Sequence, residues 1–118
     1  MEYTITAEEG LLRAHAWGRE TQQVPQQFCA ALLAEACRLK ITRLLIELTQ
    51  KIALSAASQF HLIDRLPSLG ITPDHRIALV HHTPGLYEAS DMIDIVAANR
   101  GLNVKVFRDV DAALAWLG

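Results

Sequence analysis

The sequence has few of the residues from which disulfide, redox or metal sites are built. Only two of its 118 residues are cysteine, and Cys29 and Cys37 stand eight positions apart in one expected helix. That separation is about 12 Å along a helix axis, which is further than a disulfide can span. No C-x-x-C pair and no metal-ligand spacing is present. We therefore predict reduced thiols, both buried as small apolar groups, and no bound metal.

The sequence also has little net charge and no long hydrophobic runs. The formal net charge is −2, which gives no electrostatic reason to expect binding to nucleic acid or to an anionic membrane surface. Apolar runs such as LLIEL and IALV are far too short to form an integral membrane segment. No secretion signal opens the chain. A cytoplasmic protein with a single domain over residues 1–118 is the expectation.

The glycine-rich and acidic motifs of several α/β enzymes are missing. Dinucleotide binding requires closely spaced glycines after a strand, and no strand–helix junction has them. The phosphate-binding GxxxxGK[ST] and the esterase GxSxG are absent. The first two expected strands end in Ala7 and Trp17, without the acidic residues of a magnesium-binding receiver domain. The sequence therefore predicts no cofactor and no catalytic residue, hence a protein that is not an enzyme.

The hydrophobic pattern predicts the order ββαβαβαβα. The expected strands cover residues 3–7, 11–17, 42–48, 76–81 and 103–107, and the expected helices cover 25–39, 55–66, 87–99 and 110–117. Strands that alternate with helices indicate an α/β fold, with a mostly parallel five-stranded sheet, an antiparallel first strand and about four helices. Within the second strand, Leu12, Ala14 and Ala16 share one face, while Arg13, His15 and Trp17 share the other.

Two helices carry clear packing signals. Phe28, Leu32, Ala36 and Leu39 mark the stripe that we expect the first helix to bury. In the last helix, Asp109 is placed to cap the first turn, and Trp116 and Leu117 supply apolar area for docking on the sheet.

Candidate binding residues follow the carboxyl ends of the strands, where ligands and partners of such sheets usually bind. Trp17 and Arg19 follow the second strand and could contact an anionic ligand, although Trp17 could equally pack under the next helix. His81 and His82 end the fourth strand. They point to opposite faces, so an exposed or loop-bonded histidine is favoured over a metal ligand at each position.

The junction after the third strand supplies the other candidates. Ile52 and Leu54 are apolar in an expected loop, so they either fold inward as a lid or form a contact surface. Ser55 precedes a helix and fits the role of its amino-terminal cap. Ser58 follows within the same helix, and no histidine stands near either serine as an activating base.

Three segments carry a resemblance to a known family: the opening hairpin with its helix, RLLIELTQKIALSAASQF, and RIALVHH…ANRGLNVKVFRDVDAALAWL. They resemble the STAS (SpoIIAA-like) superfamily, the domains related to bacterial anti-sigma-factor antagonists. The VxVFxDxxxALxWL ending is most similar to uncharacterised bacterial STAS-like proteins grouped with CRAL-TRIO lipid-transfer domains. The resemblance covers nearly the whole chain and implies a SpoIIAA-like fold.

The resemblance also implies a function. Family members are interaction modules, and many carry a serine that a partner kinase phosphorylates. In this sequence the acceptor position falls on Ala56 or Ala57. The resemblance therefore implies a non-enzymatic regulatory module with an unknown protein partner and no phosphorylatable switch. The alternative is a module that binds a lipid or another small apolar ligand. A small enzyme that uses His81 or His82 is a third hypothesis, and the sequence leaves open whether the chain forms a homo-oligomer.

The missing acceptor serine predicts the result of a kinase assay. Incubated with ATP and the kinases of anti-sigma-factor systems, the protein should incorporate no phosphate at Ser55 or Ser58, because neither has the aspartate neighbour of the family motif. Intact-mass spectrometry measures this directly. Stoichiometric phosphorylation of either serine would show that the alignment is wrong.

Overall fold

The computed structural model describes residues 2–17, 26–49, 63–81 and 91–118. In chain order the elements are β1 (Glu2–Glu8), β2 (Leu11–Trp17), α1 (Gln26–Leu39), β3 (Arg43–Thr49), the 3-10 turn Pro67–Leu69, β4 (Arg76–His81), α3 (Asp91–Asn99), β5 (Asn103–Phe107) and α4 (Val110–Leu117). Residues 63–65 are also helical. The earlier part of the helix expected over 55–66, and the first residues of the one expected over 87–99, lie outside the described residues.

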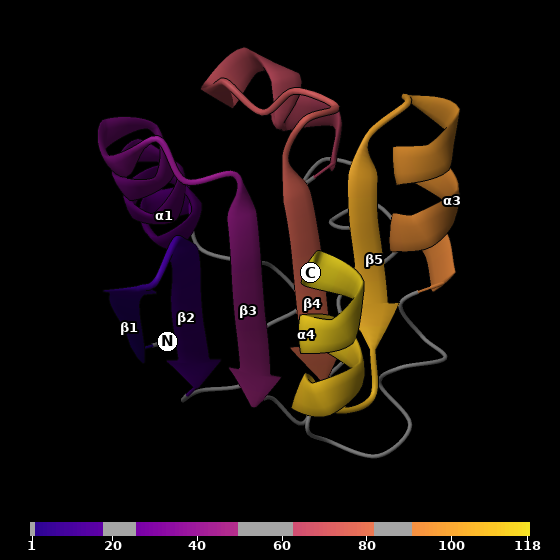
Figure 1. Ribbon diagram of the computed structural model, residues 1–118. Helices are drawn as coiled ribbons and strands as arrows, with labels where there is room; N and C mark the ends of the chain where they lie inside the picture. Colours follow the sequence, from indigo (N-terminus) through magenta and orange to yellow (C-terminus); the bar gives the residue numbers. More distant parts are fainter. Residues whose placement is uncertain (1, 18–25, 50–62, 82–90) are drawn as a thin grey trace.

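The five strands form one sheet in the order β1-β2-β3-β4-β5 (Figure 1). β1 runs antiparallel to β2, and β2 to β5 run parallel to one another. The predicted α/β class and mixed sheet are therefore confirmed.

A two-residue turn joins β1 to β2. Glu9 and Gly10 both have positive φ angles, of 45° and 79°, as a type I′ hairpin turn requires. Arg43, the first residue of β3, donates a hydrogen bond from Nη2 to the Glu9 carbonyl at 3.2 Å. A Cβ at position 10 would lie 3.1 Å from that same Nη2. Gly10 therefore serves both the backbone conformation and the close approach of Arg43.

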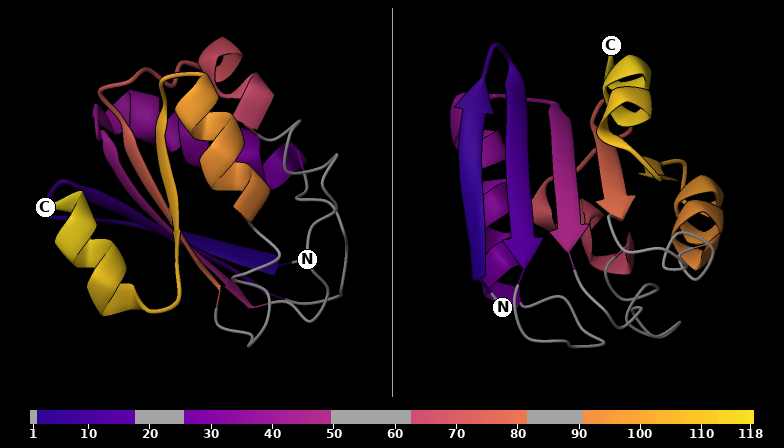
Figure 2. Two further views of the ribbon diagram at one scale, coloured as in Figure 1. Left: turned by 90° about the vertical axis from the view of Figure 1, so that its right-hand side faces the viewer. Right: turned by 90° about the horizontal axis from the view of Figure 1, so that it is seen from below.

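The larger hydrophobic core lies on the side of the sheet that carries α1 and α3, as the left view of Figure 2 shows. From the sheet it includes Leu12, Ala14, Ala16, Leu44, Leu48, Ile77, Leu79, Val104 and Val106; from the helical segments it includes Leu32, Leu33, Ala36, Ile63, Leu66, Ile93, Val96 and Ala97. The predicted inward face of β2 is confirmed, with Leu12, Ala14 and Ala16 each at most 1% exposed.

Among the described helices, only α4 lies on the opposite side of the sheet, where it packs over β4 and parts of β3 and β5 (Figure 1). Its core is small: Ala113 and Leu117 contact Leu45, Ala78 and Val80. The predicted cap is confirmed, because Asp109 Oδ1 accepts a hydrogen bond from the Ala112 amide at 2.8 Å. This bond satisfies one of the amides that a helix start leaves without an intrahelical acceptor.

Two arginines hold the last turn of α4. Arg76 Nη1 donates to the Trp116 carbonyl at 3.0 Å, and Arg43 Nη1 donates to the Gly118 carbonyl. The Arg76 guanidinium also lies 6.0 Å from the centre of the Trp116 ring. Cations are favourable at the carboxyl end of a helix, where carbonyl groups point outward. Because these arginines begin β3 and β4, they fix the position of α4 on the sheet.

The structure corrects three packing expectations. Leu39 is 37% exposed and not part of the buried stripe of α1, whereas Leu33 is buried. Cys37 is exposed, and the side chain of Cys29 lies outside the described part. Trp116 is only half-buried, with its ring 5.7 Å from that of Phe107, whereas Leu117 is buried.

Two helices end in the same backbone motif with different residues. After α3, the Leu102 amide bonds the Ala97 carbonyl and Gly101 has φ 68°. After α1, the Ile41 amide bonds the Ala36 carbonyl, and Lys40 takes the corresponding left-handed position with φ 55°. Glycine is favoured there because a Cβ is strained at positive φ. Lys40 therefore carries strain that Gly101 avoids.

This pair gives a stability prediction. Lys40→Gly should raise the free energy of unfolding by about 0.5–1 kcal/mol, because it removes the left-handed strain. Gly101→Ala should lower it by about 1 kcal/mol through backbone strain alone, since an added methyl meets no atom within 4 Å. Urea unfolding measures both. If Lys40→Gly is destabilising, the motif assigned to the end of α1 is wrong.

Candidate functional site

α4 leaves the β1–β2 side of its sheet face uncovered by any described helix (right view of Figure 2). We call this area the open face. Its described side chains include those of Thr4, Thr6, Arg13, His15, Trp17, Glu47 and Thr49. Each is exposed or half-buried. The open face is the candidate functional site because it is a polar, accessible surface on a rigid sheet.

Strand register brings these residues together. In β2, alternation turns Arg13, His15 and Trp17 away from the large core. The parallel pairing of β2 with β3 places His15 beside Glu47 and Trp17 beside Thr49. Residues paired across strands share a face, so side chains that are 34 positions apart in the sequence become neighbours.

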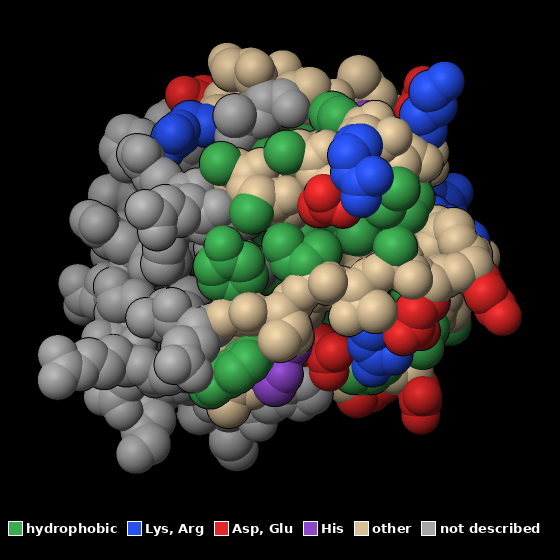
Figure 3. Space-filling model, turned by 90° about the vertical axis from the view of Figure 1, so that its left-hand side faces the viewer, with side chains coloured by type: hydrophobic (Ala, Val, Ile, Leu, Met, Phe, Trp, Pro, Cys, Tyr) green, Lys and Arg blue, Asp and Glu red, His purple; other side chains and the backbone are tan. Residues whose placement is uncertain are grey.

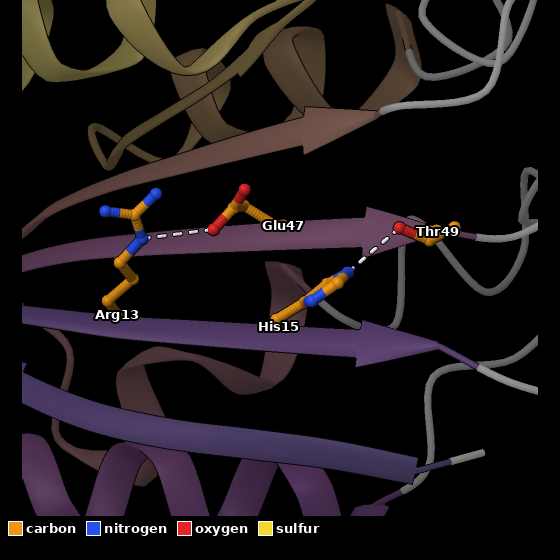
Figure 4. A network of polar contacts seen from close by, with 4 residues as sticks. All are labelled: Arg13, His15, Glu47 and Thr49. Carbon is orange, nitrogen blue, oxygen red and sulfur yellow. Dashed lines mark hydrogen bonds and ion pairs between the residues drawn. The ribbon is translucent and has the colours of Figure 1, made fainter.

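Two polar contacts connect the strands (Figure 4). Arg13 Nε donates to Glu47 Oε2 at 3.1 Å, and His15 Nε2 lies 2.9 Å from Thr49 Oγ1. The Glu47 side chain is only 14% exposed, whereas that of Arg13 is 36% exposed. The ion pair is thus half-shielded from water, and its arginine end faces outward. The contacts hold these side chains in defined positions before any partner binds.

Trp17 lies at the end of this row. Its ring centre is 5.2 Å from that of His15, and the two planes are tilted by 45°. A half-buried tryptophan beside an imidazole offers a large apolar area with few rotatable bonds. The row therefore combines an arginine, two hydrogen-bonding side chains and an aromatic ring, a composition suited to contact with a polar macromolecular surface.

The His15–Thr49 pair has the distance of a hydroxyl nucleophile and its base. Thr49, however, is exposed and His15 is half-buried, so solvent reaches both side chains. Catalysis of this kind depends on donors arranged around a site from which water is excluded. A hydrogen bond that fixes the imidazole is the simpler account of the contact.

The structure describes two of the residues that the sequence proposed for a binding site, Trp17 and His81. Trp17 belongs to the open face. His81, at the end of β4, pairs with Leu48 and turns to the side of the large core, where it is 4% exposed. The expectation of an exposed His81 is corrected, because its strand position faces the side that carries α1 and α3. These two residues therefore do not share one surface. A bond between His81 and a loop stays a prediction.

Six further proposed residues lie outside the described part of the chain: Arg19, Ile52, Leu54, Ser55, Ser58 and His82. Their roles stay predictions. Glu47 and Thr49 were not among the candidate residues from the sequence. They are an acidic and a polar position that follow the apolar run LLI in the strand RLLIELT. That interruption was the available signal, since a strand covered on both faces should be apolar throughout.

The described residues contain neither a cluster of metal ligands nor a membrane-spanning helix. Within 2–17, 26–49, 63–81 and 91–118, no cluster of three or more His, Cys, Asp or Glu side chains is arranged to hold a metal ion. None of the helices in these ranges is long and apolar enough to cross a bilayer.

The fold and the open face define the chain as an α/β protein with a mixed five-stranded sheet and one half-covered face. No family model, no curated protein and no solved structure matches it. The STAS resemblance thus stays a hypothesis that depends on the sequence motifs alone.

The half-shielded ion pair predicts a measurable coupling energy. A double-mutant cycle with Arg13→Ala and Glu47→Gln should give about 1 kcal/mol between the two side chains, near the upper end for pairs that water still reaches. Denaturant unfolding of the four proteins measures it.

The matched control is the Glu35–Arg38 pair on the surface of α1. It is well formed, with Arg38 Nη2 2.7 Å from Glu35 Oε2, and the Arg38 hydrogen bond lowers the pKa of the Glu35 carboxyl. Its side chains are more exposed, at 38% and 66%, so solvent screens the pair and its coupling should be the smaller of the two. Equal couplings would mean that the open face does not shield Arg13 and Glu47.

Proposed function

We propose that this chain is a non-enzymatic, STAS-like interaction module that binds another protein through its open face. The observation that carries the proposal is the uncovered half of the sheet, on which Arg13, His15 and Trp17 are held in position by Glu47, Thr49 and one another. Acting as a regulator in the cytoplasm is part of the same hypothesis, and the exposed thiol of Cys37 fits a reducing compartment.

The composition of the open face supports a protein partner. Tryptophan and arginine are the residue types most enriched among those that dominate protein–protein binding energy. Both are half-buried here, so each loses less side-chain freedom on binding than a fully exposed side chain would. The neighbouring threonines supply hydroxyl groups for a hydrogen-bonded rim.

The rigidity of the open face supports the same proposal. It lies on β-strands whose opposite face forms the large core, so binding requires no rearrangement of the backbone. The alternative, a lipid or other small apolar ligand, would need an apolar cavity. The open face is polar and carries the Arg13–Glu47 ion pair, which favours the protein partner.

Affinity capture with matched variants tests the proposal. Tagged wild-type protein, Trp17→Ala and Ile95→Ala are expressed in the native host, and co-purifying proteins are quantified by mass spectrometry. Ile95 is the control because it is apolar and 57% exposed on α3, on the other side of the sheet. We expect a partner enriched with wild type and Ile95→Ala but reduced at least about tenfold with Trp17→Ala, as for a binding residue worth 1.4 kcal/mol or more.

Native mass spectrometry of the same material separates the alternatives. A retained fatty acid or other small molecule that persists in Trp17→Ala would contradict the open face as the functional surface and support the ligand carrier. A partner that Trp17→Ala retains and Ile95→Ala loses would move the interface to α3.

A further inference from the structure

The two edges of the sheet are protected very differently. At the β5 edge, α3 packs against the strand, and Asp94 Oδ1 accepts a hydrogen bond from the Val106 amide at 3.1 Å. Lys105 adds a charged side chain in the middle of β5 and is exposed. A covering helix, a bonded edge amide and a central lysine are the devices by which proteins prevent strand-to-strand association.

β1, at the other edge, has none of these devices among the described residues. It is seven residues long, EYTITAE, without proline, lysine or an irregularity in its pairing with β2. All its described side chains are exposed except Ile5, which is half-buried, and Tyr3 is 39% exposed. Figure 3, which looks onto this side of the molecule, shows hydrophobic side chains gathered beside charged ones.

We propose that β1 pairs with β1 of a second copy of this chain, which gives an antiparallel dimer with one continuous sheet of ten strands. A twofold axis perpendicular to the sheet would keep α1 of both copies on the same side. In that arrangement one residue of β1 stands opposite its own copy, and the sequence decides which one.

The register centred on Thr4 is self-complementary. Tyr3 then stands opposite Ile5 of the second copy, and the reverse, on the side of the large core. An aromatic residue opposite a β-branched one is a favourable cross-strand pair, and so is Thr4 opposite its own copy on the open face. A register centred on Ile5 would instead align the acidic positions Glu2 and Glu8 twice, and like charges directly opposite are destabilising.

The dimer would also enlarge the open face. β2 and β1 of each copy would lie between the two α4 helices and form one polar floor four strands wide, with strands about 4.8 Å apart. Arg13 and His15 of both copies would be on that floor. The inference does not depend on the proposed partner, because pairing at β1 does not involve Trp17.

Analytical ultracentrifugation of two matched lysine variants tests the pairing. Thr4 and Thr6 are both exposed threonines on the same face of β1. Thr4→Lys places two lysines opposite each other at the axis, whereas Thr6→Lys places a lysine opposite acidic position 2 of the other copy. We expect a wild-type dimer over roughly 1–100 µM, a dissociation constant raised at least about tenfold by Thr4→Lys, and no weakening by Thr6→Lys. Circular dichroism verifies that both variants are folded.

A covalent test covers the case in which a lysine variant does not fold. Thr4→Cys, in a Cys37→Ser background, should oxidise to a disulfide-linked dimer, because opposed residues of antiparallel strands lie about 4.5–5.5 Å apart at Cα. Thr6→Cys in the same background should not. A wild-type protein that is monomeric throughout the concentration range, or equal effects at positions 4 and 6, would overturn the proposal. A protein that stays monomeric but binds a foreign strand at β1 would also overturn it.

Discussion

The strands lie side by side in sequence order, and this order determines which face of the sheet the helices cover. Each parallel strand is added on the same side of the previous one, from β2 to β5. Because βαβ connections are almost always right-handed, successive connections in one direction place their helices on a single face. α1 and α3 contribute to the same core, together with Ile63 and Leu66. Of the helices that the structure describes, the one on the opposite face is α4, which follows β5 (Figure 1).

α4 is too short to cover that face. Its eight residues pack on β4 and parts of β3 and β5, and Arg43 and Arg76 hold its last turn there. On the strands that α4 does not reach, the side chains of this face are of types common on protein surfaces. They are threonines in β1, and Arg13, His15 and Trp17 in β2. The contrast between Leu45, buried under α4, and Glu47, two positions later on the same side of β3, marks where the cover ends.

The sequence predicted the parts of this arrangement that depend on local pattern. The alternation in β2 identified its buried face, the Asp109 cap located the start of α4, and the strand–helix order gave the fold class. Hydrophobic periodicity does not show where the neighbouring elements that bury a helix face end. Leu39 and Cys37, near the end of α1, were therefore expected to be buried but are exposed. The pairs Arg13–Glu47 and His15–Thr49 join residues 34 positions apart. Their contact depends on the register of β2 against β3, which a single sequence does not specify.

Covalent labelling of histidines directly tests which face of the sheet is open and which is buried. His15 on β2 and His81 on β4 lie on parallel strands that are separated by β3, and their side chains are on opposite faces of the sheet. His15 belongs to the open face, whereas His81 is 4% exposed beside the large core. Diethylpyrocarbonate treatment of the folded protein, followed by peptide mass spectrometry, should modify His15 many times faster than His81. The difference should disappear in denaturant. Equal rates in the folded protein, or faster modification of His81, would contradict the open face.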